Sequence, residues 1–320
     1  MQTVLHVLVI RVWRGFDKTI SARFAKYQTA AVNAIDANST IFEQPSTTDA
    51  IARAMVERQQ EAFHLLPQTL DVSAWHNGIP IVSHVHATIA ARHVTTFIGP
   101  SGGGKTAFLR LLCRMEDPSF ISRTTGRILL NGEDILTFPS RSSSMTSLRQ
   151  QVKYVSQTPN LFPSSIFENI AYSIRIQGRI HKTEIGKRVI QSLQHVGLWN
   201  DLKDHLQESA SVLSYTQQWH LCLARTLVLE PKILLLDHPD SFLEQETIEL
   251  LATLFEALRN QGCTIILAVS AMDFAQRVSQ TIGFFLDGAL IEYAPLHQVL
   301  ADPSNWHTRL FLRDRALRRL

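Results

Sequence analysis

Residues 99–106 of this sequence read Gly99-Pro100-Ser101-Gly102-Gly103-Gly104-Lys105-Thr106. They match the pattern G-x-x-x-x-G-K-[ST] at every fixed position. The residues before them, Val94 to Ile98, are apolar or β-branched and predict a buried strand, and apolar residues at helical spacing follow between Ala107 and Met115. In a strand–loop–helix unit of this kind, backbone N–H groups and the start of the helix surround phosphate oxygens. The segment therefore predicts a site for the phosphates of a nucleoside triphosphate.

Two side chains of this segment have expected roles at such a site. Lys105 is predicted to reach the β- and γ-phosphates, and Thr106 is predicted to offer its hydroxyl to Mg²⁺. The alternative is a glycine-rich turn that binds nothing. The concentration of glycine argues against that alternative, since four of the chain's 14 glycines lie in these eight positions.

A second element of the predicted site is an apolar run that ends in a carboxylate, Ile233-Leu234-Leu235-Leu236-Asp237. In phosphate-loop enzymes a buried strand of this type delivers an aspartate to Mg²⁺, although any parallel strand can end in aspartate. The next residue is His238, where many phosphate-loop ATPases carry a glutamate that orients and deprotonates the attacking water. A neutral imidazole can accept a proton, but it differs from a carboxylate in shape and charge. Loss of a general base typically costs about 10²- to 10⁴-fold in rate.

The composition is that of an ordinary globular protein. Hydrophobic residues make up 45% of the chain and charged residues 18%, which is ample material for a core. The formal net charge is +3, and basic residues cluster only at the end, at Arg313, Arg315, Arg318 and Arg319. Such a tail is more typical of a solvated helix end than of a nucleic-acid site, so no nucleic-acid partner is expected.

The cysteines and the apolar runs bear on the compartment. Cys113, Cys222 and Cys263 lie far apart, without the spacing of a disulfide framework or a zinc site. They are predicted to be small core residues in a reducing compartment. No apolar run approaches the roughly 18 residues that a membrane span requires, and no secretory signal is recognisable. A cytoplasmic protein is expected.

The order of the predicted elements indicates an α/β fold. Residues 1–64 differ in character from the rest and carry no chemical motif, whereas from about Leu70 apolar strands alternate with helical patterns. Asn131-Gly132 predicts a tight hairpin turn, and helical periodicity dominates between Ser164 and Leu229. The predicted strands are 128–130, 152–155, 232–236, 264–269 and 281–286, and one predicted helix buries Ile185, Val189, Leu193 and Val196 before Gly197 ends it.

Two further segments resemble a known family. The first is Tyr154-Val155-Ser156-Gln157 with the following Pro159, Leu161-Phe162-Pro163 and Ser165-Ile166-Phe167-Glu168-Asn169-Ile170. The second begins Leu213-Ser214-Tyr215-Thr216-Gln217 and continues through Leu221-Cys222-Leu223-Ala224-Arg225. Over residues 68–312 the chain resembles ATP-binding-cassette (ABC) transporter ATPases. The branch that it resembles in particular, the phosphate (Pst-type) importers, is indicated by Leu-Cys-x-Ala-Arg, Cys113-Arg114-Met115, Leu198-Trp199-Asn200 and Phe284-Phe285-Leu286.

The resemblance implies a P-loop NTPase fold with a RecA-like core, a small antiparallel β subdomain and an inserted helical subdomain. ATP and Mg²⁺ are the implied cofactors, with Gln157, Thr106 and Asp237 at the metal. The implied organisation is an N-terminal extension of unknown role (1–64), an ATP-binding domain (65–312) that contains the helical subdomain (about 160–228), and a basic tail (313–320).

The resemblance also implies the residues that contact the nucleotide. Ser214 and Gln217 belong to the family signature, which contacts the nucleotide of an opposite subunit. Trp75 lies near the position of an aromatic residue that stacks on adenine, although a lone tryptophan is as often a core residue. The other implied contacts are Gly99, Pro100, Ser101, Gly102, Gly103, Gly104, Lys105 and Thr106.

The chain departs from the family pattern at four places. Tyr215 and Thr216 replace the two signature glycines, and His238 stands at the position of the catalytic glutamate. Ser270 falls at the position of the switch histidine that contacts the γ-phosphate, and Ser241-Phe242-Leu243-Glu244 replaces Ser-Ala-Leu-Asp. These places serve dimer closure and ATP cleavage. The residues that hold phosphate and metal are intact: Lys105, Thr106, Gln157 and Asp237.

Three functional hypotheses follow. The leading one is an ATP-binding subunit of an importer, most like phosphate import, with hydrolysis weakened or lost. It would form a homodimer, or a heterodimer with another ABC ATPase, and would couple dimer closure to transmembrane permease subunits at the inner face of the plasma membrane. The second is a nucleotide-binding regulatory or scaffold protein without a transport cycle. The third is a fully active importer ATPase in which His238 replaces glutamate chemically.

Overall fold

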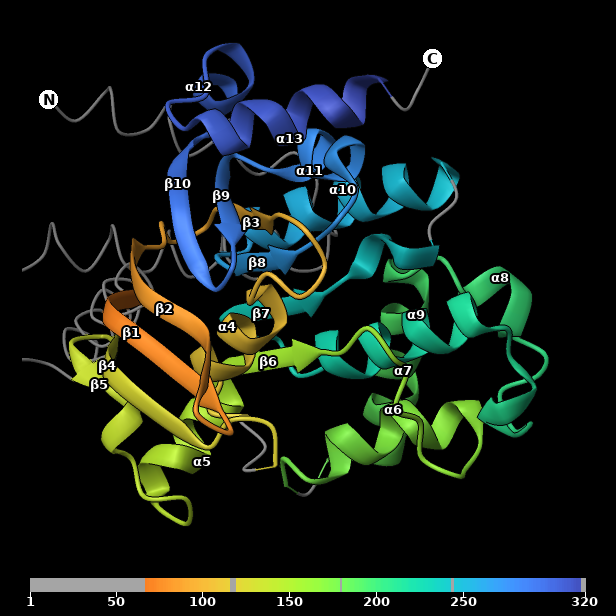
Figure 1. The fold of residues 1–320 in the computed structure, drawn as a ribbon. Helices are drawn as coiled ribbons and strands as arrows, with labels where there is room; N and C mark the ends of the chain where they lie inside the picture. Colours follow the sequence, from red (N-terminus) through yellow and green to blue (C-terminus); the bar gives the residue numbers. More distant parts are fainter. Residues whose placement is uncertain (1–66, 116–118, 179, 243–244, 318–320) are drawn as a thin grey trace, which may run out of the picture. The chain divides into compact units, whose positions relative to one another are not determined.

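One sheet organises the described part of the chain (Figure 1). The computed structural model describes residues 67–317, apart from 116–118, 179 and 243–244. The predictions for residues 1–64 and for Arg318 and Arg319 lie outside these residues. Within them the sheet has ten strands in the order β5-β4-β1-β2-β10-β9-β3-β8-β7-β6. The strand bounds are β1 Gln68–His76, β2 Ile79–Thr88, β3 Val94–Ile98, β4 Arg123–Leu130, β5 Glu133–Asp134, β6 Val152–Val155, β7 Ile233–Asp237, β8 Thr264–Ala268, β9 Thr281–Leu286 and β10 Ala289–Pro295.

Tight turns build the antiparallel end of the sheet, which consists of β5, β4, β1 and β2. Asn131 and Gly132 have φ values of 55° and 81° between β4 and β5, the left-handed pair that a type I′ turn requires. The predicted hairpin is therefore confirmed. Asn77-Gly78 and Asp287-Gly288, which were not predicted, form turns of the same kind before β2 and β10.

The other end of the sheet places the predicted site residues together. Strands β9, β3, β8, β7 and β6 are parallel, so their carboxyl ends lie along one edge, where ligands bind in open α/β sheets. The loop 99–106 follows β3, Gln157 follows β6, Asp237 ends β7 and Ser270 follows β8. Parallel pairing thus explains why residues far apart in the sequence meet.

Helices bury both faces of these parallel strands. Leu234 and Leu236 of β7 join a core with α6, α7, α9, α10 and α11, whereas Ile233 and Leu235 join the core around α4 and α5. Helices α6–α9, green in Figure 1, form a group of their own beside the sheet. The helix bounds are α4 Lys105–Leu112, α5 Ser143–Gln151, α6 Ile166–Arg175, α7 Lys182–His195, α8 Trp199–Leu202, α9 Tyr215–Leu227, α10 Gln245–Asn260, α11 Met272–Val278, α12 Leu296–Ala301 and α13 Trp306–Leu317, with 3₁₀ turns at Ile135–Thr137, Ala210–Val212 and Pro239–Phe242.

Helix α4 is held in place by an aromatic cluster. The ring of Phe108 meets Phe97 of β3 with centroids 5.1 Å apart and Phe285 of β9 at 5.3 Å. All three side chains are fully buried. Edge-to-face and tilted ring pairs of this kind add about 0.5–1.5 kcal/mol each beyond the burial of their area. The cluster fixes the start of α4 against the strands that carry the site.

The helical insertion has the predicted buried face. Ile185, Val189, Leu193 and Val196 are buried in the core of this group. Gly197 follows α7 with a φ of 76°, and a Cβ at this position would lie 2.7 Å from a methyl carbon of Leu250. Gly197 thus supplies the left-handed conformation that commonly follows a helix end, at a position with little room for a side chain.

A few element boundaries differ from the predictions. Helix α4 begins at Lys105 and ends at Leu112, because Arg114 adopts a left-handed φ of 52°. Met115, predicted on the apolar face of this helix, lies beyond it and is 53% exposed. Strand β7 includes Asp237 itself, one residue further than predicted, and β8 ends one residue earlier.

Three expectations about composition can be compared with the structure. Cys113, Cys222 and Cys263 are all buried, as predicted for core residues. Among the described residues, no helix combines the length and the apolar character that a membrane crossing demands. Arg313 and Arg315 belong to α13, in agreement with the expected helix end.

Candidate functional site

The glycine loop between β3 and α4 lies tightly against neighbouring backbone. A Cβ on Gly99, whose φ is 142°, would come within 2.1 Å of the carbonyl oxygen of Phe285. A Cβ on Gly104, whose φ is 99°, would lie 2.6 Å from the carbonyl oxygen of Ile81. Any other residue would clash at both positions. The loop thus depends on glycine to fit between β9 and β2.

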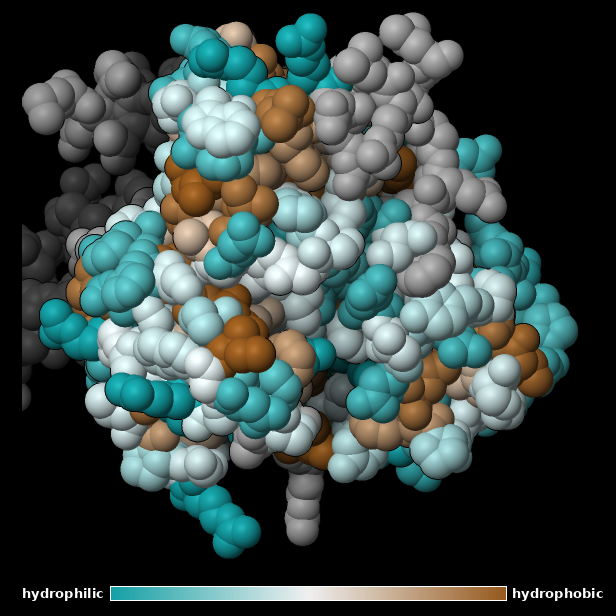
Figure 2. All heavy atoms as spheres, in the orientation of Figure 1, coloured by the Kyte–Doolittle hydropathy of each residue, from teal (hydrophilic) through white to brown (hydrophobic). Residues whose placement is uncertain are grey.

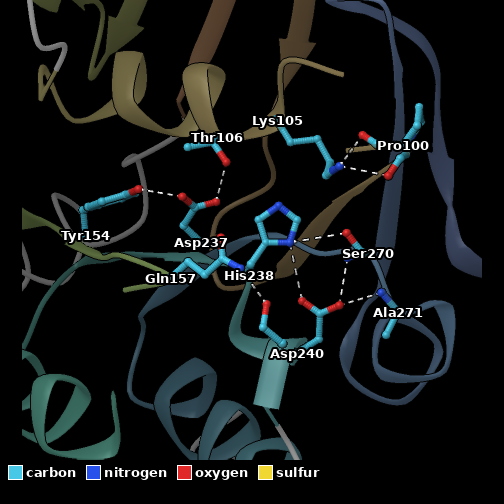
Figure 3. Close-up of polar contacts among 12 residues, drawn as sticks. Pro100, Lys105, Thr106, Tyr154, Gln157, Asp237, His238, Asp240, Ser270 and Ala271 are labelled. Carbon is cyan, nitrogen blue, oxygen red and sulfur yellow. Dashed lines mark hydrogen bonds and ion pairs between the residues drawn. The ribbon is translucent and has the colours of Figure 1, made fainter. Parts of the chain in front are cut away.

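Lys105 places a buried positive charge inside this loop. The side chain is only 3% exposed, and its Nζ donates hydrogen bonds of 2.9 Å to the carbonyl oxygens of Gly99 and Pro100 (Figure 3). The lysine is the first residue of α4, so its charge adds to the positive end of the helix. Together they create a local field that favours an anion.

Asp237 brings a buried carboxylate to the same place from β7. It is 3% exposed, its Oδ1 accepts a 2.8 Å hydrogen bond from the Thr106 hydroxyl, and its Oδ2 accepts a 2.7 Å bond from the Tyr154 hydroxyl. Figure 3 shows these three side chains converging from three elements. Burial, and then the negative charge of Asp237, raise the pKa of Tyr154 well above its usual range. The phenol therefore stays protonated and remains a donor.

The oxygen atoms around Asp237 have the chemistry that Mg²⁺ prefers. A carboxylate and a hydroxyl lie within one hydrogen-bond length of each other, close enough to share one small cation or the water around it. Hard oxygen donors of this type suit Mg²⁺ rather than softer metals. The donor set therefore fits the expected cation.

His238 forms a second cluster beside this one, with Asp240 and Ser270. Its Nδ1 lies 3.4 Å from the Ser270 hydroxyl oxygen and 3.8 Å from Asp240 Oδ1. Asp240 Oδ2 accepts hydrogen bonds of 2.8 Å and 2.5 Å from the backbone N–H groups of Ser270 and Ala271. In Figure 3 the opposite edge of the imidazole faces the side of the site where Lys105 and Thr106 lie.

The Asp240 carboxylate is strongly buried, with a side chain only 4% exposed. Burial alone would raise its pKa, but the nearby His238 ring and the hydrogen bonds from the backbone of Ala271 and Ser270 outweigh this and lower the pKa. Asp240 therefore ties the loop after β7 to the start of α11 as a charged acceptor. Asp240 could not be assigned from the sequence because its partners lie 30 and 31 positions away.

Gln157 lies in the loop after β6, where α9 reaches it. Its amide Nε2 donates to the Ser241 hydroxyl at 3.0 Å, and its backbone carbonyl accepts from the Tyr215 hydroxyl at 3.4 Å. The neighbouring carbonyl of Ser156 accepts from Trp219 Nε1 at 3.1 Å. Tyr215 thus lies against the glutamine loop of its own chain. Residues 243 and 244 of the segment 241–244 lie outside the described residues.

Ser214 and Gln217 form a reciprocal cap at the start of α9. The Ser214 hydroxyl accepts from the Gln217 N–H at 3.3 Å, and Gln217 Oε1 accepts from the Ser214 N–H at 3.0 Å. This capping box satisfies two backbone donors of the first turn. The structure places both residues on α9, a different element from the strand and helix that flank the loop 99–106.

Trp75 lies on β1, in the antiparallel part of the sheet. The Arg123 guanidinium is stacked over its ring at 5.1 Å from the centroid, and the side chain is half-buried. The ring thus already has one cationic neighbour on one face. Its predicted contact with adenine stays a prediction.

The geometry agrees with comparisons to known proteins. Residues 82–241, half of the chain, match the family model described as ABC transporter. The chain belongs to the ABC transporter ATPase family. The predicted resemblance is thereby confirmed, and with it the P-loop NTPase fold with a RecA-like core, an antiparallel β subdomain and an inserted helical subdomain.

Individual members of the ABC family extend the match over most of the chain. The phosphate import ATP-binding protein PstB of Bacteroides fragilis is 36% identical over 245 residues, which cover 77% of this chain and 95% of that protein. A PstB 1 of Streptococcus agalactiae is 35% identical, with coverage of 77% and 96%. The dimeric ATP-binding cassette MJ0796 bound to ADP and Pi has the same fold, with a TM-score of 0.64 at 22% identity over 72% of this chain and 98% of that one.

Proposed function

We propose that this chain is the ATP-binding subunit of an ABC importer, most like those that import phosphate. The proposal is carried by one observation: a buried lysine, a glycine loop and the side-chain oxygens of Thr106 and Asp237 converge at one sheet edge, in a chain with PstB relatives at 36% identity. The chain would act at the inner face of the plasma membrane, in contact with transmembrane permease subunits.

Binding of ATP would use the groups already gathered at this edge. The loop 99–106 would surround the phosphates, and the Lys105 ammonium would exchange its two carbonyl partners for phosphate oxygens. Thr106, Asp237 and Gln157 would hold Mg²⁺, which supplies positive charge against the phosphates. Trp75 would offer one ring face to the adenine.

Hydrolysis would be weakened or lost because of the residues at the other cluster. His238 and Ser270 replace the two side chains that the family uses beside the γ-phosphate. The Nδ1 edge of His238 faces Ser270 and Asp240, so only its opposite edge is left for a water molecule. A serine hydroxyl is also too short and too weak a base to replace an imidazole.

The partner cassette would be a second copy of this chain or another ABC ATPase. In such a dimer Ser214 and Gln217 would face the nucleotide of the partner. Tyr215 and Thr216 add side chains where glycines would let the backbone come close. Tyr215 is 40% exposed and rests on the loop carbonyl of Gln157. A partner with an intact signature would serve the nucleotide of this chain better than a second copy would.

The transmembrane subunits would bind to the helical subdomain. Tyr172 and Ile176, at the end of α6, are 51% and 65% exposed. Phe162 lies next to Tyr172 with ring centroids 5.0 Å apart. The Arg225 guanidinium lies over the Phe162 ring, 4.6 Å from its centroid. In Figure 2 hydrophobic atoms (brown) reach the surface over this region among hydrophilic ones. Exposed apolar groups of this kind suit a protein–protein contact.

The first test is ATP binding and turnover by the full chain with Mg²⁺. Lys105→Ala should lower ATP affinity by about 100-fold or more, because each hydrogen bond to a charged group contributes about 1.5–3 kcal/mol. Lys153→Ala is the matched control. Lys153, on β6, also bonds a backbone carbonyl, but that of Arg149 on α5 rather than one of the loop 99–106. Unchanged ATP affinity in Lys105→Ala would refute the proposed site.

A second measurement separates the transport subunit from a regulatory protein. The chain is co-expressed with the permease subunits that match it, and the membrane fraction is analysed for association and for ATP-dependent transport. Association that depends on Ile176 and Tyr172 supports the importer. ATP binding without any association favours a regulatory or scaffold protein instead.

A further inference from the structure

Tyr154 is the residue that joins β6 to the carboxylate at the end of β7. In the parallel pair β6–β7, Tyr154 lies opposite Leu235. Because side chains alternate along a strand, Leu235 and Asp237 point to the same face of the sheet. The Tyr154 hydroxyl reaches Asp237 Oδ2 at 2.7 Å on that face. The contact is thus built into the register of two buried strands.

The direction of this hydrogen bond follows from the chemistry of the two groups. A carboxylate has no hydrogen to give and only accepts, so the Tyr154 hydroxyl donates to Asp237. Its hydrogen is thus committed to Asp237. The positive charge of the Arg110 guanidinium on α4 acts on both Tyr154 and Asp237.

The two oxygens of Asp237 therefore have separate partners. Tyr154 holds Oδ2, and the Thr106 hydroxyl donates to Oδ1 at 2.8 Å. A carboxylate that is bound at both oxygens from two different elements cannot rotate freely. A hydroxyl that donates its hydrogen still keeps lone pairs. Oδ1 and the Thr106 oxygen thus form a fixed pair of acceptors on the side that faces the glycine loop.

We infer that Tyr154 is a positioning residue for the metal site: it holds Asp237 Oδ2 so that Oδ1 stays beside Thr106, and it thereby sets how strongly Mg²⁺ supports nucleotide binding. The inference rests on the proposed function, because it requires that ATP binds at this site. Residues that hydrogen-bond a metal ligand typically change metal affinity by about 10- to 100-fold when they are lost. Tyr154 has this relation to Asp237.

The test compares ATP affinity with excess Mg²⁺ and with EDTA, for the wild-type chain and for Tyr154→Phe. The substitution keeps the ring and removes only the hydroxyl. The ratio of the two affinities should fall by about 10-fold or more, while affinity in EDTA should stay unchanged and report an intact loop. Mn²⁺ titration followed by electron paramagnetic resonance, with ATP present, should show the same loss of metal affinity without any turnover.

Tyr293→Phe is the matched control. Tyr293 lies on β10 and donates to the Thr88 carbonyl at 3.1 Å, so its hydroxyl is equally engaged but belongs to another part of the sheet. The ratio should not change in this variant. An equal loss of affinity with and without Mg²⁺ in Tyr154→Phe, or an unchanged ratio, would overturn the inference alone. Absence of ATP binding by the wild-type chain would overturn the proposed function and the inference with it.

Discussion

The two clusters at the carboxyl edge of the sheet differ in how they are built. The binding side consists of the loop 99–106 with Asp237, and its polar groups bond to one another and to backbone carbonyls. The switch side consists of His238, Asp240 and Ser270, which bond mainly to each other and to the start of α11. In the resemblance drawn from the sequence, only the binding side keeps the residue types of the ABC family pattern.

Binding a nucleotide and cleaving it make separate chemical demands on one fold. Phosphate binding needs backbone N–H groups, one cation and a few oxygens, which the packing of α4 against Phe97 and Phe285 fixes in advance. Cleavage adds groups that act on the water and the departing phosphate in the transition state. A chain can therefore change the second set and keep the first.

The largest expected effect comes from rebuilding the switch side. His238→Glu, Ser270→His, Tyr215→Gly and Thr216→Gly together should raise ATP turnover by about 10²- to 10⁴-fold, since they restore a carboxylate base and its neighbours. The structure adds a condition, because Asp240 lies 3.8 Å from the residue 238 ring nitrogen. The negative charge of Asp240 would therefore repel a glutamate carboxylate at position 238.

The same four changes combined with Asp240→Asn should therefore turn over ATP faster than the four alone. Steady-state phosphate release by both variants, at equal ATP occupancy, measures this. If turnover stays flat in both variants while binding persists, the difference between the two sides does not lie in these residues. The remaining departure from the family pattern, the segment 241–244, would then be the next to restore.

An intermediate effect is expected from His220, in α9. Its Nε2 is buried without a hydrogen-bond partner, and burial lowers its pKa to about 4. The unfolded chain binds the proton more readily, at about pH 6.5. Stability should thus be full above pH 6.5 and should fall by about 3 kcal/mol in all as pH drops to 4.

His220→Phe should flatten this part of the pH profile of the free energy of unfolding, measured by urea denaturation between pH 7 and pH 4. The same change at the exposed His93 serves as control and should leave the slope as it is. An unchanged slope in His220→Phe would show that another group titrates. This measurement tells whether the α9 side of the site is sensitive to acid in a way that the binding side is not.

The smallest expected effect is that of Asp240→Asn alone. The change removes a buried charge that accepts two backbone hydrogen bonds, and should lower the free energy of unfolding by about 1–2 kcal/mol at pH 7. Because the folded-state pKa of Asp240 is lowered, its contribution is present above the unfolded pKa, about 3.9, and is lost as pH falls through the folded value.

Denaturant unfolding of the two proteins at pH 7 and near pH 3 checks this, with the exposed Asp302→Asn as control. The difference between wild type and Asp240→Asn should shrink at the lower pH. A difference that stays constant would mean that size or packing, rather than charge, explains the loss. ATP affinity should be the same in both proteins, since Asp240 belongs to the switch side.

Local sequence was enough to predict the strands, the loop and the helix that carry the binding side. The glycine pattern, the flanking strand and helix, and Asp237 at the end of an apolar run each depend on neighbours in the chain. Asn131-Gly132 predicted its turn in the same way, and Asn77-Gly78 carries the same local signal. Tyr154 and Asp240 could not be assigned, because Tyr154 meets Asp237 only through the β6–β7 register and Asp240 meets α11 only across the sheet edge.

The two aromatic residues of α9 have a mechanical consequence. Tyr215 and Trp219, one helical turn apart, each donate a hydrogen bond to a backbone carbonyl of residues 156–157. Because the acceptors are backbone atoms, a substitution in this loop does not remove them. The loop and the first turns of α9 are thus linked by two hydrogen bonds. A displacement of this loop is therefore expected to move the first turns of α9 with it.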